Sequence, residues 1–219
     1  MVRRRETIEL DGASFVAHLL DYALAIPTGD RRIVVIAGPP ASGKSTLAEA
    51  LDRHLNAAEP GLCAQLPMDG FHYDDEVLIA RGWRPRKGAP HTFDVGGYAT
   101  ALRRLRANDE ESVAVPRFDR AIEIARAGAI VIEHSVRLIV TEGNYLLLDV
   151  SPWSELRPSF DRAALLVTDM ATLESRNRQR WVDIDMDEDG IRAKLEENDL
   201  PNARLVVERS TAPDWIVRT

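Results

Sequence analysis

The residues with the clearest chemical potential form the run Gly-Pro-Pro-Ala-Ser-Gly-Lys-Ser-Thr, from Gly38 to Thr46. The run lies between an apolar, β-branched segment and a segment of helical character. Glycines let such a loop curl so that its backbone N–H groups cradle phosphates, and the helix N-terminus adds its positive dipole end. Lys44 suits the β- and γ-phosphates, and the Ser45 hydroxyl suits Mg²⁺. The run predicts nucleoside triphosphate binding, through Gly38, Ala41, Ser42, Gly43, Lys44, Ser45 and Thr46.

Two carboxylates stand where other predicted strands end. Asp69 follows the apolar run 62–66, and Glu142 closes the run that begins at Arg137. Open α/β sheets place their chemistry at these carboxyl ends. Phosphoryl transfer to a hydroxyl needs a carboxylate that accepts the proton and oxygen ligands for Mg²⁺. We expect Asp69 to be the base and Glu142 a metal ligand with Ser45, although either carboxylate alone could be a helix cap or turn former.

Strand and helix patterns alternate along the chain, which predicts an α/β fold with a parallel sheet covered by helices on both faces. The expected strands cover residues 33–37, 62–66, 113–120 (a short edge strand), 137–143, 163–169 and 215–217. The expected helices cover about 11–26, 47–56, 98–106, 173–181, 191–198 and 202–208, and a further helical turn or two ends near 81–82. One domain accounts for residues 1–219.

Two basic stretches interrupt this acidic chain. The long loop around 83–94 carries three basic residues, and loops of this length are uncommon in compact domains unless they are functional. In the helix around 173–181, Arg176 and Arg180 are four residues apart and share one face. Both stretches could also be solvated surface charge.

Composition bounds the remaining possibilities. The chain has 219 residues, a net charge of −7 and 45% hydrophobic residues, typical of an ordinary globular domain. The acidic balance argues against broad nucleic-acid or membrane-surface binding. The single cysteine excludes an internal disulfide, and no apolar run reaches transmembrane length. We expect a cytoplasmic protein.

Several motifs resemble those of known kinases. Asp69-Gly70-Phe71, Arg86-Lys87-Gly88-Ala89-Pro90 and Val115-Pro116-Arg117-Phe118-Asp119 resemble pantothenate kinase. Thr141-Glu142-Gly143 resembles the strand end of uridine kinases and phosphoribulokinases. Together with Asn198-Asp199-Leu200-Pro201-Asn202-Ala203, the set is most similar to bacterial fructose-transport-system kinases, and it implies the P-loop NTPase fold with a small helical lid.

The resemblance implies a role for each matching residue. Asp69 would be the catalytic base, Glu142 a Mg²⁺-associated acid, and Arg176 and Arg180 lid arginines that close on the phosphates, Arg176 in catalysis and Arg180 in nucleotide binding. The lid would cover about 171–198 and an acceptor-binding loop about 70–97. The acceptor pocket would contain His72, Arg86, Lys87, Arg117, Asn144 and Tyr145. His72-Tyr73-Asp74-Asp75 departs from the pantothenate kinase pattern, which leaves the acceptor open.

The leading interpretation is an ATP- and Mg²⁺-dependent kinase acting on a hydroxyl of a small polar metabolite, with a sugar such as fructose as the first candidate. Pantothenate, a nucleoside or a nucleotide monophosphate are alternative acceptors. A GTPase switch is disfavoured because no Asn-Lys-x-Asp tetrad occurs, and a motor because the strand end is Thr-Glu-Gly. A non-catalytic nucleotide sensor of a sugar-transport system remains an alternative, and a homodimer remains open.

Overall fold

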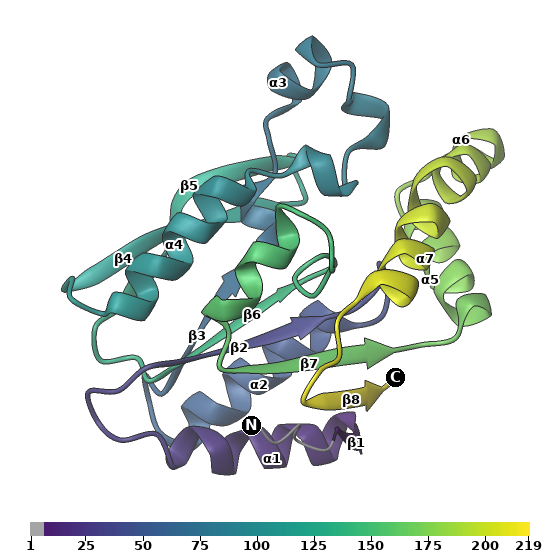
Figure 1. The fold of residues 1–219 in the computed structure, drawn as a ribbon. Helices are drawn as coiled ribbons and strands as arrows, with labels where there is room; N and C mark the ends of the chain where they lie inside the picture. Colours follow the sequence, from purple (N-terminus) through teal and green to yellow (C-terminus); the bar gives the residue numbers. More distant parts are fainter. Residues whose placement is uncertain (1–6) are drawn as a thin grey trace.

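The computed structural model describes residues 7–219, and its centre is a 6-stranded sheet in which the neighbouring strands are parallel (Figure 1). In spatial order the strands are β1 (Ile8–Asp11), β8 (Trp215–Arg218), β7 (Arg162–Val167), β2 (Arg32–Ala37), β6 (Leu138–Gly143) and β3 (Cys63–Pro67). The predicted strands at 33–37, 62–66, 137–143, 163–169 and 215–217 all fall in this sheet. The predicted α/β class is therefore confirmed. Strand β1 was not predicted.

Helices cover both faces of the sheet because successive residues of its strands point to opposite sides. Val34 and Ile36 of β2 pack in the cluster formed with α1 (Gly12–Leu24) and α2 (Lys44–Ala58). Ile33 and Val35 pack in the opposite cluster, which includes α4 (Val95–Ala107) and the 3₁₀ turn Trp153–Ser159. Strand β2 is thus buried on both sides, as its continuous apolar run requires.

The segment predicted as a short edge strand is instead half of a separate hairpin. Strand β4 (Ser112–Asp119) pairs antiparallel with β5 (Ile124–Glu133), and the register shifts between Val115 and Arg117, at Pro116. Strand β5 escaped prediction because most of its residues are exposed or half-buried, with Ile132 buried. Its sequence therefore lacks the alternation that marks a half-buried strand.

The chain between β3 and α4 forms short helical turns, and two of them lie in the 83–94 segment that the sequence predicts to be one long loop. They are the 3₁₀ turns Met68–Phe71, Arg84–Arg86 and Pro90–Thr92, and the helix α3 (Asp75–Ala80). Helix α4 begins three residues before its predicted start because the Asp94 carboxylate accepts the N–H of Gly97 at 2.9 Å and caps it.

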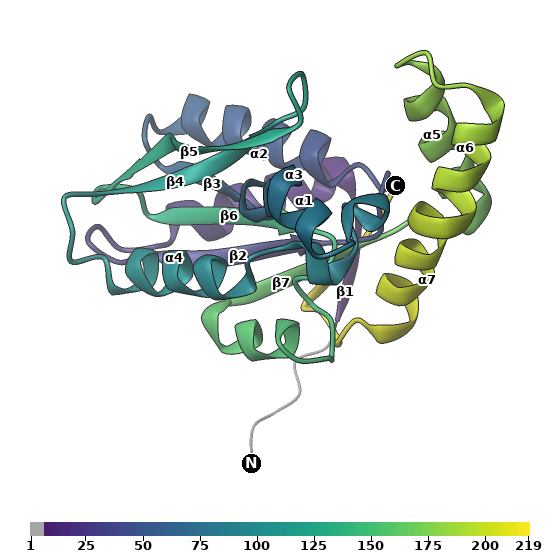
Figure 2. The ribbon, with the colours of Figure 1, turned by 90° about the horizontal axis from the view of Figure 1, so that it is seen from above.

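The predicted lid is a set of helices at the carboxyl end of the sheet (Figure 2). Helix α5 (Met170–Val182) is followed by α6 (Glu188–Lys194), a π-helical turn (Leu195–Asp199) and α7 (Leu200–Arg209). The last three run on without the break that the sequence predicts between 198 and 202, and Pro201 comes directly after the π-helical turn, in the first turn of α7. No helix among residues 7–219 is long and apolar enough to cross a membrane.

Candidate active site

The carboxyl ends of three adjacent strands bring the predicted catalytic residues together. In the register of the sheet, Ala37 of β2 is opposite Gly143 of β6, and Pro67 of β3 is opposite Glu142. The phosphate-binding loop leaves β2 at this edge and enters α2, with Gly43 at the N-cap in the left-handed region (φ 88°). Glycine adopts this conformation without strain, so its place in the motif follows from the turn.

Lys44 is buried in this loop, with 7% of its surface exposed. Its Nζ donates a hydrogen bond to the Pro39 carbonyl oxygen at 2.8 Å. Burial lowers the pKa of Lys44 to about 8, while the nearby carboxylate of Glu142 acts in the opposite direction. The lysine is thus held in place by the loop itself. Its charge is poorly solvated in this buried position, and phosphate oxygens would supply the missing solvation.

Ser45 and Glu142 form a pair of oxygen donors beside Lys44. The Ser45 hydroxyl donates to Glu142 Oε1 at 3.2 Å. Burial, together with the neighbouring Asp69 carboxylate, raises the pKa of Glu142 to about 7. Residues 7–219 contain no cluster of three or more His, Cys, Asp or Glu side chains that could hold a metal ion. One hydroxyl and one carboxylate fit Mg²⁺, which commonly takes its other ligands from water and substrate phosphates.

Asp69 lies in the 3₁₀ turn after β3, and its Oδ2 accepts a hydrogen bond from Arg120 Nη2 at 2.8 Å. The β4–β5 hairpin supplies Arg120 and packs directly on this turn, since a Cβ on Gly70 would lie 2.4 Å from the Pro116 carbonyl oxygen. Asp69 does not cap the helix that follows, because Asp74 caps α3. Sequence reasoning missed Arg120, although it stands one residue after the run that carried the family resemblance.

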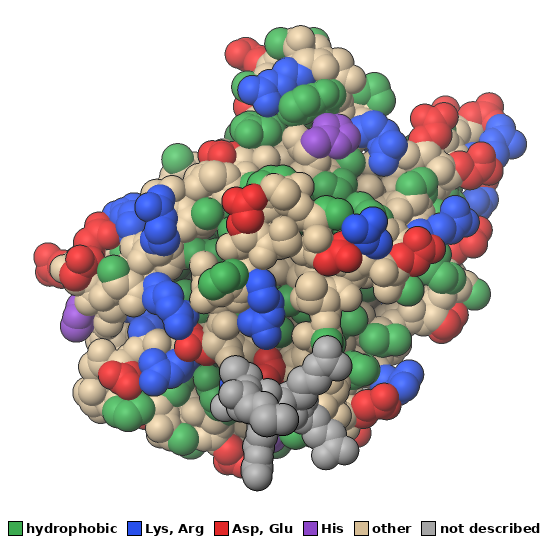
Figure 3. Space-filling model, in the orientation of Figure 1, with side chains coloured by type: hydrophobic (Ala, Val, Ile, Leu, Met, Phe, Trp, Pro, Cys, Tyr) green, Lys and Arg blue, Asp and Glu red, His purple; other side chains and the backbone are tan. Residues whose placement is uncertain are grey.

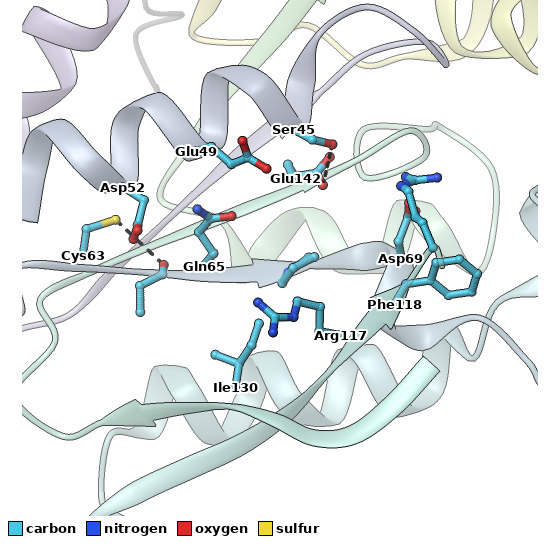
Figure 4. Close-up of a pocket in the computed structure, with 13 residues that line it drawn as sticks. Ser45, Glu49, Asp52, Cys63, Gln65, Asp69, Arg117, Phe118, Ile130 and Glu142 are labelled. Atoms are coloured by element: carbon cyan, nitrogen blue, oxygen red, sulfur yellow. Dashed lines mark hydrogen bonds and ion pairs between the residues drawn. The ribbon is translucent and has the colours of Figure 1, made fainter. Parts of the chain in front are cut away.

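A cavity of about 420 Å³ extends from these groups between α2, β3 and the hairpin (Figure 4). Ser45, Asp69 and Glu142 line it together with Glu49, Asp52, Cys63, Ala64, Gln65, Pro67, Arg117, Phe118, Arg120 and Ile130. Glu49 on α2 and Gln65 on β3 stand on one wall, and Arg117 reaches in from the hairpin. Sequence reasoning missed Glu49 and Gln65, although Glu49 is one helical turn after Ser45 and so shares its face.

Arg117 is the one residue of the predicted acceptor set that lines this cavity. His72 stacks on Phe93 (ring centroids 3.9 Å apart), and burial lowers its pKa to about 4, so the ring is neutral near pH 7. Lys87 Nζ pairs with Asp75 at 2.8 Å. The His72 ring centre lies 5.1 Å from the centre of the Phe118 ring, and Lys87 Nζ lies 5.2 Å from the same centre. His72 and Lys87 thus stand behind Phe118, one layer away from the cavity.

The other three members of the predicted acceptor set also lie away from the cavity lining. The Tyr145 hydroxyl donates to the Gly88 carbonyl oxygen, and Asn144 lies beside Tyr145. Arg86 Nε donates to Asn198 Oδ1 at 3.3 Å. These contacts join the 84–92 segment to the chain just after β6 and to the π-helical turn.

The two predicted lid arginines approach the site differently. Arg176 Nη1 donates to the Ala41 carbonyl oxygen of the phosphate-binding loop at 3.4 Å. Arg180 pairs with Asp199 at 3.6 Å, and its guanidinium lies 4.4 Å from the centre of the Trp181 ring. Helix α5 therefore already touches the loop in this conformation.

Known proteins share this fold and much of the sequence. A solved protein of Silicibacter sp. TM1040, provisionally named a fructose transport system kinase, is 39% identical and superposes with a TM-score of 0.84 over 94% of this chain and 98% of its own. YggC of Escherichia coli K12 is 32% identical over 202 residues, 91% of this chain and 83% of YggC. A Schizosaccharomyces pombe protein provisionally named uridine kinase C227.14 is 29% identical over 220 residues, 96% of this chain and 93% of that protein.

No protein-family model matches the chain. The long matches nevertheless confirm the resemblance drawn from the motifs, and more distant matches extend to pantothenate kinases and phosphoribulokinase. They also confirm that the protein is an enzyme that uses ATP and acts on a small molecule. The chain belongs to the P-loop kinases of the uridine kinase, pantothenate kinase and phosphoribulokinase superfamily.

Proposed function

We propose that this kinase transfers the γ-phosphate of ATP to a hydroxyl of a small polar metabolite, and that the metabolite is a sugar, with fructose as the first candidate. The observation that carries the proposal is the meeting of Ser45, Glu142 and Asp69 at one end of a cavity of about 420 Å³, with the Lys44 charge interacting with both carboxylates. The name of the 39% identical Silicibacter protein favours a sugar. The polar lining of the cavity supports the same class of acceptor.

Asp69 would act as the general base. Arg120 occupies its Oδ2, which fixes the carboxylate and leaves Oδ1 to accept the proton of the acceptor hydroxyl. As that hydroxyl oxygen bonds to the γ-phosphorus, the bond to the β–γ bridging oxygen breaks and ADP leaves. Lys44, Arg176 and Arg180 would balance the charge on the phosphate oxygens. Ser45 and Glu142 would hold Mg²⁺, which when bound supplies further neutralisation of the phosphates.

The acceptor would lie in the cavity with its reactive hydroxyl at Asp69. Glu49, Gln65 and Arg117 offer acceptor and donor groups at hydrogen-bonding positions along the walls. The volume suits a metabolite of modest size. The 70–97 segment would support this site through His72 and Lys87 behind Phe118, and the lid, about 171–198, would close over the phosphates.

We also propose a cytoplasmic enzyme, alone or as a homodimer, without a nucleic-acid partner. The net charge of −7 supports this, because nucleic-acid binding depends on clustered Lys and Arg. On the face drawn in Figure 3, basic and acidic side chains are interspersed. The single cysteine, Cys63, is buried, which suits a reducing compartment but does not require one.

The test measures ATP consumption by the purified protein against sugars, nucleosides, pantothenate and sugar phosphates. One strong acceptor identifies the substrate, and Asp69→Asn should then lower kcat by about 10²–10⁴-fold with little change in ATP affinity. Asp74→Asn makes the same chemical change in the same segment and should leave kcat unchanged, because Asn also caps helices. Normal turnover in Asp69→Asn would refute the base, and silence across the panel would favour the sensor interpretation.

A further inference from the structure

Three polar side chains are buried where the π-helical turn runs into α7, at the end of the predicted lid. Asn198, Asp199 and Asn202 are 5%, 3% and 3% exposed. Burying such groups is unfavourable unless each is hydrogen-bonded. Asn198 and Asp199 lie in the π-helical turn, a type of irregularity that frequently occurs at functional sites. The motif that contains them has no role in the mechanism above.

Asn198 faces the acceptor side of the molecule. Its Nδ2 donates to the Lys87 carbonyl oxygen at 3.0 Å, and its Oδ1 accepts from Arg86 Nε at 3.3 Å. Asn202, one turn later, donates to the same Oδ1 at 3.1 Å and fixes the amide. The π-helical turn is therefore hydrogen-bonded to the 84–92 segment, on the acceptor side of the molecule.

Asp199 faces the lid. Its Oδ2 accepts the Trp181 indole N–H at 2.6 Å, and its Oδ1 lies 3.6 Å from Arg180 Nη2. Arg180 also covers the Trp181 ring, so indole, carboxylate and guanidinium form one packed group at the end of α5. Asp199 is buried while 42% of the Arg180 side chain is exposed, which makes the carboxylate the fixed partner and the arginine the adjustable one.

Arg180 lies within electrostatic reach of the catalytic groups. Its charge contributes to the lowered pKa of Lys44, and it interacts in turn with Asp69 and Arg120. A long arginine side chain needs a fixed anion to hold it toward such a site, since it otherwise samples many rotamers.

We propose that Asp199 is a positioning residue that aims Arg180 at the phosphates of bound ATP. The hydrogen bonds of Asn198 to Arg86 and Lys87 fix the position of the Asp199 carboxylate relative to the 84–92 segment. The inference rests on the proposed function in one respect, the role of Arg180 at the phosphates.

A double-mutant cycle tests the proposal. Asp199→Asn keeps the shape and can still accept the Trp181 N–H, but it removes the charge that faces Arg180. We expect it to lower kcat about tenfold with an acceptor KM changed by less than about twofold. In an Arg180→Met background the same change should alter kcat by less than about twofold. Glu197→Gln is the matched control, since Glu197 is exposed in the same turn, and should leave kcat unchanged.

Melting temperatures of all variants separate this role from a structural one. If the role is structural, Asp199→Asn should lower the melting temperature, and it should lower kcat by the same factor in the wild-type and Arg180→Met backgrounds. That result would overturn the proposal. An unchanged kcat in the Asp199→Asn single variant would also overturn it. If the wild-type protein phosphorylates nothing in the acceptor panel, the proposed function fails separately. The cycle is then measured on the dissociation constant of ATP with Mg²⁺, where additive effects refute the positioning role and coupled effects support it.

Discussion

Lys44 and Glu142 carry opposite charges in the same buried site, and burial shifts the pKa of each toward neutrality. The pKa of Lys44 falls to about 8 and that of Glu142 rises to about 7. Phosphate oxygens favour the charged form of Lys44, and a divalent cation favours the charged form of Glu142. Binding of ATP with Mg²⁺ should therefore change the protonation of both residues.

The direction of this proton transfer depends on pH. At about pH 6 Glu142 is mostly protonated in the free enzyme, so binding should release protons to the solvent. At about pH 8.5 Lys44 is largely neutral, so binding should take protons up. Calorimetry in buffers of different ionisation enthalpy measures both. After the protons bound or released by the nucleotide itself are subtracted, Glu142→Gln should no longer release protons at about pH 6. Lys44→Arg should no longer take up protons at about pH 8.5. Release of the same size in Glu142→Gln would contradict the assignment.

At the scale of elements, α5 and α6 are anchored by few buried side chains. The buried residues are Leu173 and Asn177 in α5 and Ile191 in α6, while Val182 and Ile184 are exposed at the tip between them. Sparse burial of this kind lowers the free energy of local opening. Arg176 of α5 already contacts the phosphate-binding loop, so the closure that we propose would need only a local movement.

We predict that amides from about 171 to 198 exchange more slowly once ATP, Mg²⁺ and the acceptor are bound together. Closure would exclude water from the transferring phosphate and order both helices. Hydrogen exchange measured by mass spectrometry checks this, with α1, whose buried side chains share a core cluster with those of α2, as the internal control. If the segment is already fully protected in the free protein, the lid assignment is wrong.

The elements also show which parts of the site could be predicted. The places of Lys44, Asp69 and Glu142 follow from strand ends, because parallel strands align their carboxyl ends. The Arg120–Asp69 contact joins residues 51 positions apart through a hairpin whose second strand has almost no buried face, so no local pattern marks it. Likewise, the resemblance places Arg86 and Lys87 in the acceptor pocket, whereas the pairing of Lys87 with Asp75 follows only from tertiary packing.

At the scale of the whole molecule, one buried arginine connects separate parts of the chain. Arg31, just before β2, is 8% exposed. Its guanidinium donates to backbone carbonyl oxygens at the end of α4 and in the turn from β5 to β6. These are Leu105 at 3.0 Å, Glu133 at 2.6 Å, His134 at 3.3 Å and Val136 at 2.9 Å. Burial lowers the pKa of Arg31, but a guanidinium keeps its charge in proteins.

We predict that Arg31→Met lowers the free energy of unfolding by about 2–4 kcal/mol, because it leaves several buried carbonyl oxygens without donors. Arg31→Lys should recover only part of this, since an ammonium cannot donate to carbonyl oxygens in so many directions. Arg32→Met is the matched control. Arg32 pairs with Asp30 at 3.2 Å near the surface, so its loss should cost less than about 1 kcal/mol. Urea unfolding measures all three variants, and equal losses at both positions would contradict the role of Arg31. ATP affinity should stay unchanged in each variant, because the contacts of Arg31 lie at the opposite end of β2 from the phosphate-binding loop.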